Sequence, residues 1–302
     1  MRFTVVTCGT EGDTRPIIGV CRGLLNAGHD VQFFGDRSTL SIAESHGIPA
    51  QPLHGDIKAV LDSGRAFENP TQSEGKVIHL AKFLAQIANE NALQWMKEVG
   101  DDARSSQAIL FSGIASYVGL AIAEGLRLPG VGLGLLPISP TMAFPSPLLP
   151  FRKFPKILNR ISYKAVNTLF WYLFRRKINV ARKEIYGQES RKKMWRDYPI
   201  LYGISRHLIP EPTDWPEIWK LCGAWTTEHA NWQPPASLVD FLASGPPPIY
   251  VGFGSMAGFD RQKMLATVIE AVDGRRALFF PGWSGIEPNL LPRNFFVIGA
   301  TP

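Results

Sequence analysis

The N-terminal part of the chain alternates between short apolar runs and amphipathic stretches, with glycine-rich turns between them. Phe3 to Thr7 is a β-branched run of strand length, and apolar residues from Ile17 to Leu25 recur at helical spacing before Gly28. The next strand is expected at Val31 to Phe34. Because two strands joined by a helix form a crossover unit, this pattern predicts a parallel α/β sheet.

The same alternation continues along the chain until a proline-rich loop is reached at 137–150. A basic, aromatic helical region is expected from Pro155 to Tyr186, followed by a strand at Leu201 to Ser205. The predicted architecture is therefore a Rossmann-like, doubly wound parallel sheet. Before the loop, the expected helices are 37–46, 74–99 and 116–125, and the expected strands are 50–53, 108–112 and 131–135.

A chain of 302 residues is expected to form about two domains. We place an N-terminal domain at 1–214, an interdomain linker rich in Pro and Trp at 215–248, and the start of a second domain at 249–302. The second domain opens as the first does, with a strand at Ile249 to Gly252. About fifty residues are too few to close a doubly wound sheet, so we expect this domain to be incomplete.

Composition excludes several classes of protein. With 45% apolar residues the chain can bury a large core, which argues against disorder, a disulfide miniprotein or a simple coiled coil. The three cysteines have neither disulfide nor zinc spacing and fit a reducing cytoplasm, so no metal or cofactor is predicted. Two uncharged stretches, 108–123 and 128–151, are not expected to span a membrane, since the first is short and the second contains six prolines.

Positive charge is concentrated in one segment. Residues 151–198 contain 14 Lys and Arg against 3 Asp and Glu, a net charge of +11, whereas the rest of the chain has a net charge of −5. Aromatic residues interleave with the basic ones between 151 and 177. This composition suits peripheral contact with an anionic membrane, and it equally suits a helix that packs its aromatic residues inward. No recognition motif accompanies the charge, so nucleic acid is not a predicted partner.

Two glycine-rich turns each follow a strand and open a helix, at 9–13 and 252–256. Turns at the carboxyl ends of parallel strands favour phosphate, because backbone amides and the helix dipole meet there. Asp13 has two readings: it caps the amide positions of Arg15 or Pro16, or, kept ionised by the helix dipole, it takes a proton from a bound hydroxyl. Asp36 ends the second strand where a ribose-binding acid would lie, a single weak match to a dinucleotide site.

Several segments of the chain resemble UDP-glycosyltransferases of the sterol, lipid and antibiotic types, which form the family numbered 1 and are related to the family numbered 28. The most specific is Pro246 to Met256, which ends in Val-Gly-Phe-Gly-Ser-Met. The other resembling segments are Gly9 to Pro16, Leu24 to Val31, Pro137 to Pro145, Trp232 to Pro235 and Leu238 to Leu242.

The resemblance implies a GT-B fold, in which the N-terminal domain binds the acceptor and the C-terminal domain binds most of the nucleotide sugar. It implies an inverting transfer of a sugar, glucose in the first instance, from UDP-sugar to a hydroxyl of a sterol or other apolar lipid, with Asp13 as the general base. Donor contacts are expected from Gly12, Gly254 and Ser255, and acceptor contacts from Pro140, Thr141 and Phe144.

Two departures from the family pattern leave alternatives open. Glu11 stands where the family often has Arg, and the family's His- and Gly-rich donor motif would lie beyond Pro302. This chain is therefore expected to lack most of a donor site and, taken alone, activity. The alternatives are a non-catalytic module that binds acceptor or membrane, and a nicotinamide-dependent oxidoreductase supported by the βαβ opening and Asp36.

Overall fold

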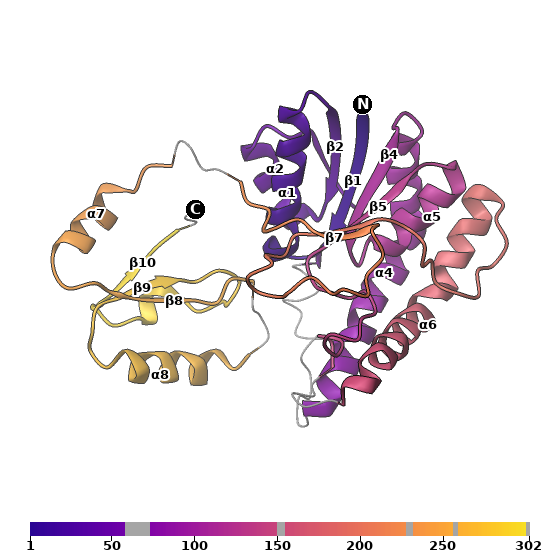
Figure 1. Cartoon of the computed structure of the whole chain (residues 1–302). Coiled ribbons are helices and arrows are strands. Elements are labelled where there is room, and N and C mark those ends of the chain that lie inside the picture. The colour runs from indigo at the N-terminus through magenta and orange to yellow at the C-terminus, as the bar shows by residue number, and fades with distance from the viewer. Residues whose placement is uncertain (58–72, 150–154, 228–231, 256–258, 300–302) are drawn as a thin grey trace. The chain divides into compact units, whose positions relative to one another are not determined.

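The computed structural model describes residues 1–57, 73–149, 155–227, 232–255 and 259–299, with side chains from residue 82 onward in the second of these ranges. The described residues divide into two compact units, the first ending at 227 and the second beginning at 232 (Figure 1). Each unit is built on its own parallel sheet.

Unit 1 contains a seven-stranded sheet in the order β3-β2-β1-β4-β5-β6-β7, and every neighbouring pair is parallel. The order reverses at β1, between β2 and β4, which is the mark of a doubly wound sheet. The strands are β1 (Arg2–Cys8), β2 (Asp30–Gly35), β3 (Ala50–Pro52), β4 (Ala108–Gly113), β5 (Gly130–Gly134), β6 (Ile200–Tyr202) and β7 (Trp219–Leu221).

The helices cover the two faces of this sheet, with α1 and α2 on one face and α4, α5 and α6 on the other (Figure 1). The longest of them, α4 and α6, pack against each other. The helices are α1 (Glu11–Asn26), η1 (Arg37–Thr39), α2 (Leu40–Ser45), α4 (Ser73–Ala103), α5 (Ser116–Leu126), η2 (Lys156–Leu158) and α6 (Asn159–Tyr186).

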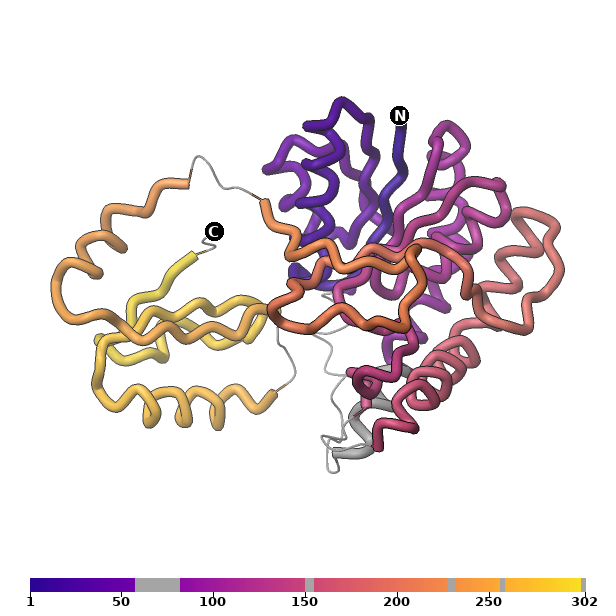
Figure 2. The backbone as a smooth tube through the Cα atoms, viewed as in Figure 1, coloured from indigo at the N-terminus to yellow at the C-terminus, as the bar shows by residue number. Residues whose placement is uncertain are grey.

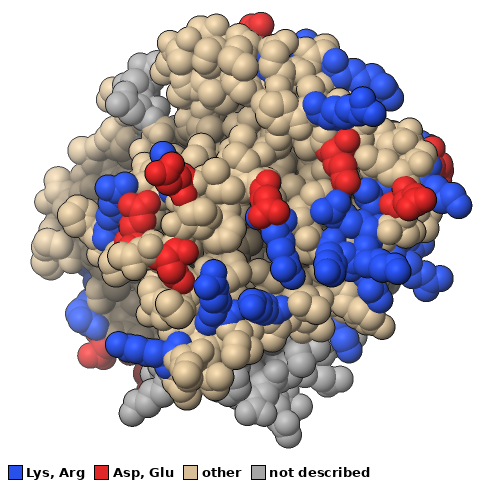
Figure 3. All heavy atoms as spheres, turned by 45° about the vertical axis from the view of Figure 1, so that its right-hand side comes forward, with Lys and Arg blue, Asp and Glu red and all other residues tan. Residues whose placement is uncertain are grey.

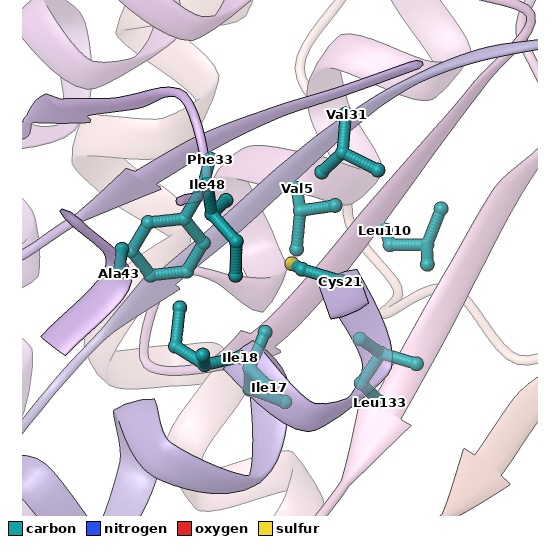
Figure 4. Packing of buried hydrophobic residues seen from close by; sticks show 10 residues of the cluster. All are labelled: Val5, Ile17, Ile18, Cys21, Val31, Phe33, Ala43, Ile48, Leu110 and Leu133. Atoms are coloured by element: carbon teal, nitrogen blue, oxygen red, sulfur yellow. The ribbon is translucent and has the colours of Figure 1, made fainter. Parts of the chain in front are cut away.

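The core beneath α1 fixes where this helix begins. Ile17, Ile18 and Cys21 are fully buried and point from α1 onto strand residues such as Val5 and Phe33 (Figure 4). Burying side chains of this size contributes about 1.5–3 kcal/mol each, so the start of α1 is held firmly over the end of β1.

Unit 2 contains a three-stranded parallel sheet in the order β10-β9-β8. Phe241 of α7 stacks on Phe296 of β10, with ring centroids 4.9 Å apart, which ties this helix to the sheet. The elements are α7 (Ala236–Ala243), β8 (Ile249–Gly252), α8 (Arg261–Val272), β9 (Ala277–Phe280), η3 (Pro288–Leu290) and β10 (Phe295–Val297).

Sequence patterns predict most of these elements. The strand expected at Leu201 to Ser205 is shorter in the structure, where β6 ends at Tyr202, and the structure differs further in two places. Helix α1 begins at Glu11, inside the glycine-rich turn predicted at 9–13. The predicted linker at 215–248 includes β7, which pairs with β6 in unit 1, and α7, which lies in unit 2. The domain boundaries at 214 and 248 stay predictions.

Among the described residues, none of the helices combines the length and apolarity that a membrane crossing needs.

An ion pair between a buried arginine and a partly exposed glutamate joins α5, α6 and the segment after α6. Arg182 is almost fully buried, and its Nη2 lies 3.1 Å from Glu124 Oε2. The same carboxylate accepts hydrogen bonds from Arg191 Nη1 (2.9 Å) and Trp195 Nε1 (2.8 Å). Burial lowers the pKa of Arg182 and the charge of Glu124 opposes this, so the two groups depend on each other.

Candidate functional site

Asp13 is the third residue of α1, directly after the end of β1. Its Oδ2 accepts a hydrogen bond from the backbone N–H of Thr10 (2.8 Å), and the carbonyl of Thr10 accepts from the N–H of Asp13 (3.0 Å). The bond from the N–H of Thr10 to the Asp13 carboxylate is one of the two reciprocal bonds of a capping box. The sequence-based cap on Arg15 or Pro16 is therefore wrong, because an acid at the third helical position reaches back to the residue that precedes the helix.

Gly9 makes room for the Asp13 side chain. A Cβ atom at residue 9 would lie 2.1 Å from Asp13 Oδ2 and 2.7 Å from Asp13 Cβ, well inside normal contact distance. The φ angle of Gly9 is not in the left-handed region. Glycine is required here by the close approach of the carboxylate rather than by backbone geometry.

Burial sets the electrostatics of this turn. It raises the pKa of Asp13 above its ordinary value of 3.8, and the hydrogen bonds from Thr10 offset only part of the rise. The predicted effect of the helix dipole is thus outweighed by desolvation. Burial also raises the pKa of the Cys8 thiol, and the nearby charges of Asp36 and Asp13 raise it further. Cys8 is consequently an inert core residue and not a nucleophile.

The two other acids near this turn have structural roles. Asp36 is 3% exposed, and its carboxylate accepts from the backbone N–H groups of Ser38 (3.0 Å) and Ile57 (2.9 Å). These bonds satisfy the buried carboxylate of Asp36 within the protein, so its position needs no bound ribose to account for it. Glu11 pairs with Arg15 one helical turn on, at 2.9 Å. Asp13 differs from both acids, because burial raises its pKa and makes its charged form costly in spite of the hydrogen bonds from Thr10.

The loop at 135–149 follows β5 and lies along the beginning of α6 (Figure 2). Tyr202 holds one end of it, since its hydroxyl lies 2.6 Å from Ser139 Oγ and accepts the backbone N–H of Ser139 at 3.1 Å. From α6, Asn159 donates to the carbonyl of Met142 (2.8 Å), and Ser162 accepts the N–H of Ser146 (2.9 Å). These contacts fix the shape of the loop.

Thr141, a predicted acceptor contact, is fully buried and donates to Asp214 Oδ1 at 2.6 Å. The second oxygen of Asp214 accepts the backbone N–H of Met142 at 2.9 Å. Burial acts to raise the pKa of Asp214, but these hydrogen bonds, a further one to its own backbone and the positive charge of Arg160 together outweigh it and leave the pKa below its ordinary value. Pro140 and Phe144 are partly exposed on either side of this anchor.

The outer side of the loop is apolar. Leu136, Ile138 and Met142 are 51%, 40% and 57% exposed, although the backbone around them is tightly held. Exposed apolar side chains on a fixed loop offer contact area to an apolar ligand, and binding costs little conformational entropy because the loop is already ordered. Because β1 and β5 belong to one parallel sheet, this loop and Asp13 both lie at the edge formed by the carboxyl ends of the strands.

The predicted donor residues Gly254 and Ser255 follow β8, at the carboxyl edge of the unit 2 sheet. The carbonyl of Gly254 accepts the N–H of Trp283 (2.7 Å), which joins the turn after β8 to the turn after β9. A Cβ at Gly282 would lie 2.0 Å from that carbonyl, so glycine is needed for the contact. Gly12 in unit 1 is exposed, with only Thr10 Oγ1 near its Cβ position.

Sequence reasoning missed the residues that support this site. Tyr202 and Asp214 anchor a loop more than sixty residues earlier in the chain, and no local pattern signals such a pairing. The described cavity of about 430 Å³, lined in part by Glu124, Gly130 and Trp195, lies at the amino end of β5 and is not part of the candidate site. Among the described residues, no group of three or more His, Cys, Asp and Glu side chains could hold a metal ion.

Sequence comparison relates the chain to fungal sterol 3-beta-glucosyltransferases. It is 29% identical over 299 residues to the protein of Neurospora crassa and 29% identical over 299 residues to that of Aspergillus oryzae. Each match covers 94% of this chain but only 19% and 21% of those proteins, so the chain spans about a fifth of the length of the curated relatives it matches. No protein-family model matches the chain.

Solved structures with the same fold are glycosyltransferases and their nucleotide complexes. The glycosyltransferase of kitacinnamycin aligns with a TM-score of 0.57 at 15% identity, covering 100% of this chain and 71% of that one. The glycosyltransferase VinC in complex with dTDP gives 0.56 at 15% identity, with 99% and 71% covered. Arabidopsis thaliana UGT89C1 complexed with UDP gives 0.57 at 14%, with 100% and 71% covered. The comparisons confirm the resemblance to UDP-glycosyltransferases and the predicted GT-B fold class.

Proposed function

We propose that this chain belongs to an enzyme that transfers glucose from UDP-glucose to the hydroxyl of a sterol or other apolar acceptor, with inversion at the anomeric carbon. The observation that carries the proposal is the similarity to sterol 3-beta-glucosyltransferases over 94% of the chain. In this proposal Asp13 is the catalytic base, the loop at 135–149 contacts the acceptor, and Gly12, Gly254 and Ser255 contact the donor phosphates.

Asp13 acts as the general base. As the acceptor oxygen attacks the anomeric carbon, the carboxylate takes the hydroxyl proton, the bond between the sugar and the diphosphate breaks, and UDP leaves with the bonding electrons. Burial supports this role, because a desolvated carboxylate with a raised pKa is a stronger base than one in water. The hydrogen bond from Thr10 and the gap at Gly9 hold the carboxylate in position.

The donor is bound at glycine turns. Gly12 lies in the first turn of α1, where the positive end of the helix dipole favours phosphate, and Gly254 and Ser255 lie in the turn that follows β8. Backbone amides at such turns stabilise the negative charge that develops on the departing diphosphate. The exposed position of Gly12 leaves its backbone accessible to a ligand.

The acceptor lies against the loop at 135–149. Leu136, Ile138 and Met142 present apolar surface, which fits the rigid hydrocarbon rings of a sterol better than a polar sugar acceptor. Pro140 and Phe144 add to this wall. Thr141 contributes through its hydrogen bond to Asp214, which holds the wall in place.

A transfer assay tests this function. The protein as its gene encodes it is incubated with UDP-glucose or other UDP-sugars and with a set of sterols, other lipid alcohols and polyphenols. Release of UDP and the mass of any glycoside are measured. We expect a sterol glucoside from UDP-glucose and no reaction with polyphenols.

Two results would contradict the proposal, and they point to different proteins. Binding of sterol without binding of UDP in calorimetry, and with no transfer, indicates a non-catalytic acceptor-binding module. Binding of NAD in place of UDP indicates an oxidoreductase, in spite of the structural use of Asp36.

A further inference from the structure

The outward face of η2 and α6 exposes large apolar side chains. Ile157 is 84% exposed, Ile161 is 56% exposed and Tyr172 is 64% exposed. The opposite face of α6 is buried against α4 and α5, and Trp171 and Phe174 pack there on Tyr117 of α5. Because residues 157 and 161 lie four apart, their side chains share one side of the chain at the point where α6 begins.

Basic residues surround these apolar side chains. From 155 to 180 the sequence has six Lys and Arg and no Asp or Glu. Lys156 and Arg160 each adjoin one of the two isoleucines in the sequence, Lys164 follows Ile161 by three residues, and all three basic side chains are exposed. In Figure 3, which brings this side of unit 1 forward, Lys and Arg side chains lie in groups, with fewer Asp and Glu side chains beside them. We call residues 156, 157, 160, 161, 164 and 172 the α6 face.

The α6 face adjoins the loop at 135–149. Asn159, between Ile157 and Ile161, donates its side-chain N–H to the carbonyl of Met142 at 2.8 Å, and Tyr163 donates to the carbonyl of Pro145 at 3.3 Å. Met142 is itself 57% exposed. Apolar surface therefore occurs on both partners of this contact, the helix and the loop.

We propose that the α6 face is a binding surface for an anionic lipid bilayer. The isoleucines enter the boundary between headgroups and acyl chains, while Lys156, Arg160 and Lys164 pair with anionic headgroups. Tyr172 has the amphipathic ring that favours the same depth. A purely polyanionic partner such as nucleic acid would use the charges but gives no reason for an isoleucine that is 84% exposed at their centre.

Cosedimentation with vesicles tests this surface in the complete protein. One set of vesicles is phosphatidylcholine alone, and in the other phosphatidylserine replaces part of it. We expect binding to the phosphatidylserine vesicles only, and weaker binding as salt is raised. Since the assay contains neither sugar nucleotide nor acceptor, its outcome is independent of the proposed function.

Three variants separate the contributions. We expect Arg160→Glu/Lys164→Glu and Ile157→Ser/Ile161→Ser each to weaken vesicle partitioning by about tenfold or more, since each removes one of the two attractions. The matched control Lys220→Glu/Lys263→Glu makes the same change in net charge on β7 and α8, and we expect it to bind as the wild type does. Circular dichroism and thermal unfolding show whether each variant is folded.

The proposal is overturned if the wild type ignores phosphatidylserine vesicles or if the control loses as much affinity as the α6 variants. It is also overturned if the isoleucine variant binds vesicles at full strength while the charge variant loses binding to vesicles and to heparin alike. That last result would show a general polyanion surface instead of a membrane surface.

Discussion

Replacing Gly9 by Ala should disable Asp13 without unfolding the protein. The new Cβ would lie 2.1 Å from Asp13 Oδ2 and 2.4 Å from Asp13 Cγ. Because the overlap extends to Asp13 Cβ at 2.7 Å, rotation of the carboxylate alone does not relieve it. The backbone at Asp13 has to move away from β1 together with its side chain, which breaks the hydrogen bond from Thr10.

The size of the effect follows from these distances. To restore normal contact the carboxylate must move by at least about 1 Å, and a displacement of this order at a reacting group costs about 100-fold in rate. Losing the hydrogen bond from Thr10 costs about 1 kcal/mol of stability. Ala restricts the unfolded chain and returns about 0.4–1 kcal/mol, since the φ of Gly9 suits any residue. The overlap with Asp13 Cβ adds an overpacking cost of about 1–3 kcal/mol. The free energy of unfolding should therefore fall by about 1–3 kcal/mol, which is less than the stability of a typical domain.

The assay pairs kcat/KM for sugar transfer with urea unfolding. Gly23→Ala is the matched control, because nothing lies within 4 Å of its Cβ position on the same helix. That variant should keep full activity and gain up to about 1 kcal/mol of stability. If Gly9→Ala transfers sugar as fast as Gly23→Ala does, the positioning of Asp13 by residue 9 is refuted.

Three further predictions concern stability. Burial raises the pKa of Asp13 from 3.8, so the folded protein loses stability as the pH rises from 3.8 through the raised value. Asp13→Asn should therefore gain stability relative to the wild type as the pH rises above 3.8, measured by urea unfolding at a series of pH values. A difference in stability that stays constant with pH would contradict this. Glu124→Ala leaves Arg182 buried without its ion-pair partner and should cost about 3 kcal/mol in urea unfolding, whereas a loss below about 1 kcal/mol would contradict the role of that pair. Asp214→Asn weakens two hydrogen bonds to the loop at 135–149 and should cost about 1–2 kcal/mol while raising KM for the apolar acceptor, and an unchanged KM would separate Asp214 from acceptor binding.

Local sequence patterns predict the strands and helices of unit 1 well, because each combines an apolar period with a glycine turn. They miss β7, which has three residues and owes its existence to pairing with β6. They also miss α7, whose eight residues lie between proline-rich stretches. Strand formation at β7 depends on an edge that only the folded sheet provides.

Sequence patterns likewise predict one part of the candidate site and miss another. The position of Asp13 at the end of the first strand can be predicted, since β-branched runs and glycine turns mark that end. The contact of Asp13 with Gly9 cannot, because it depends on a side-chain rotamer. The burial of Thr141 likewise depends on Asp214, which is 73 residues away. Long-range hydrogen bonds thus decide which residues of the loop face solvent.

Substitution of Asp13 by Asn tests the central claim most directly. Asn keeps the size of the side chain and an oxygen that can accept from Thr10, but it cannot take a proton at neutral pH. Glu11→Gln, in the same helical turn, is the matched control, since it removes only the surface pairing with Arg15. We expect Asp13→Asn to lower the rate of sugar transfer by at least about 100-fold while UDP binding and the Glu11→Gln rate stay at wild-type values. Transfer by Asp13→Asn at the wild-type rate would contradict the account.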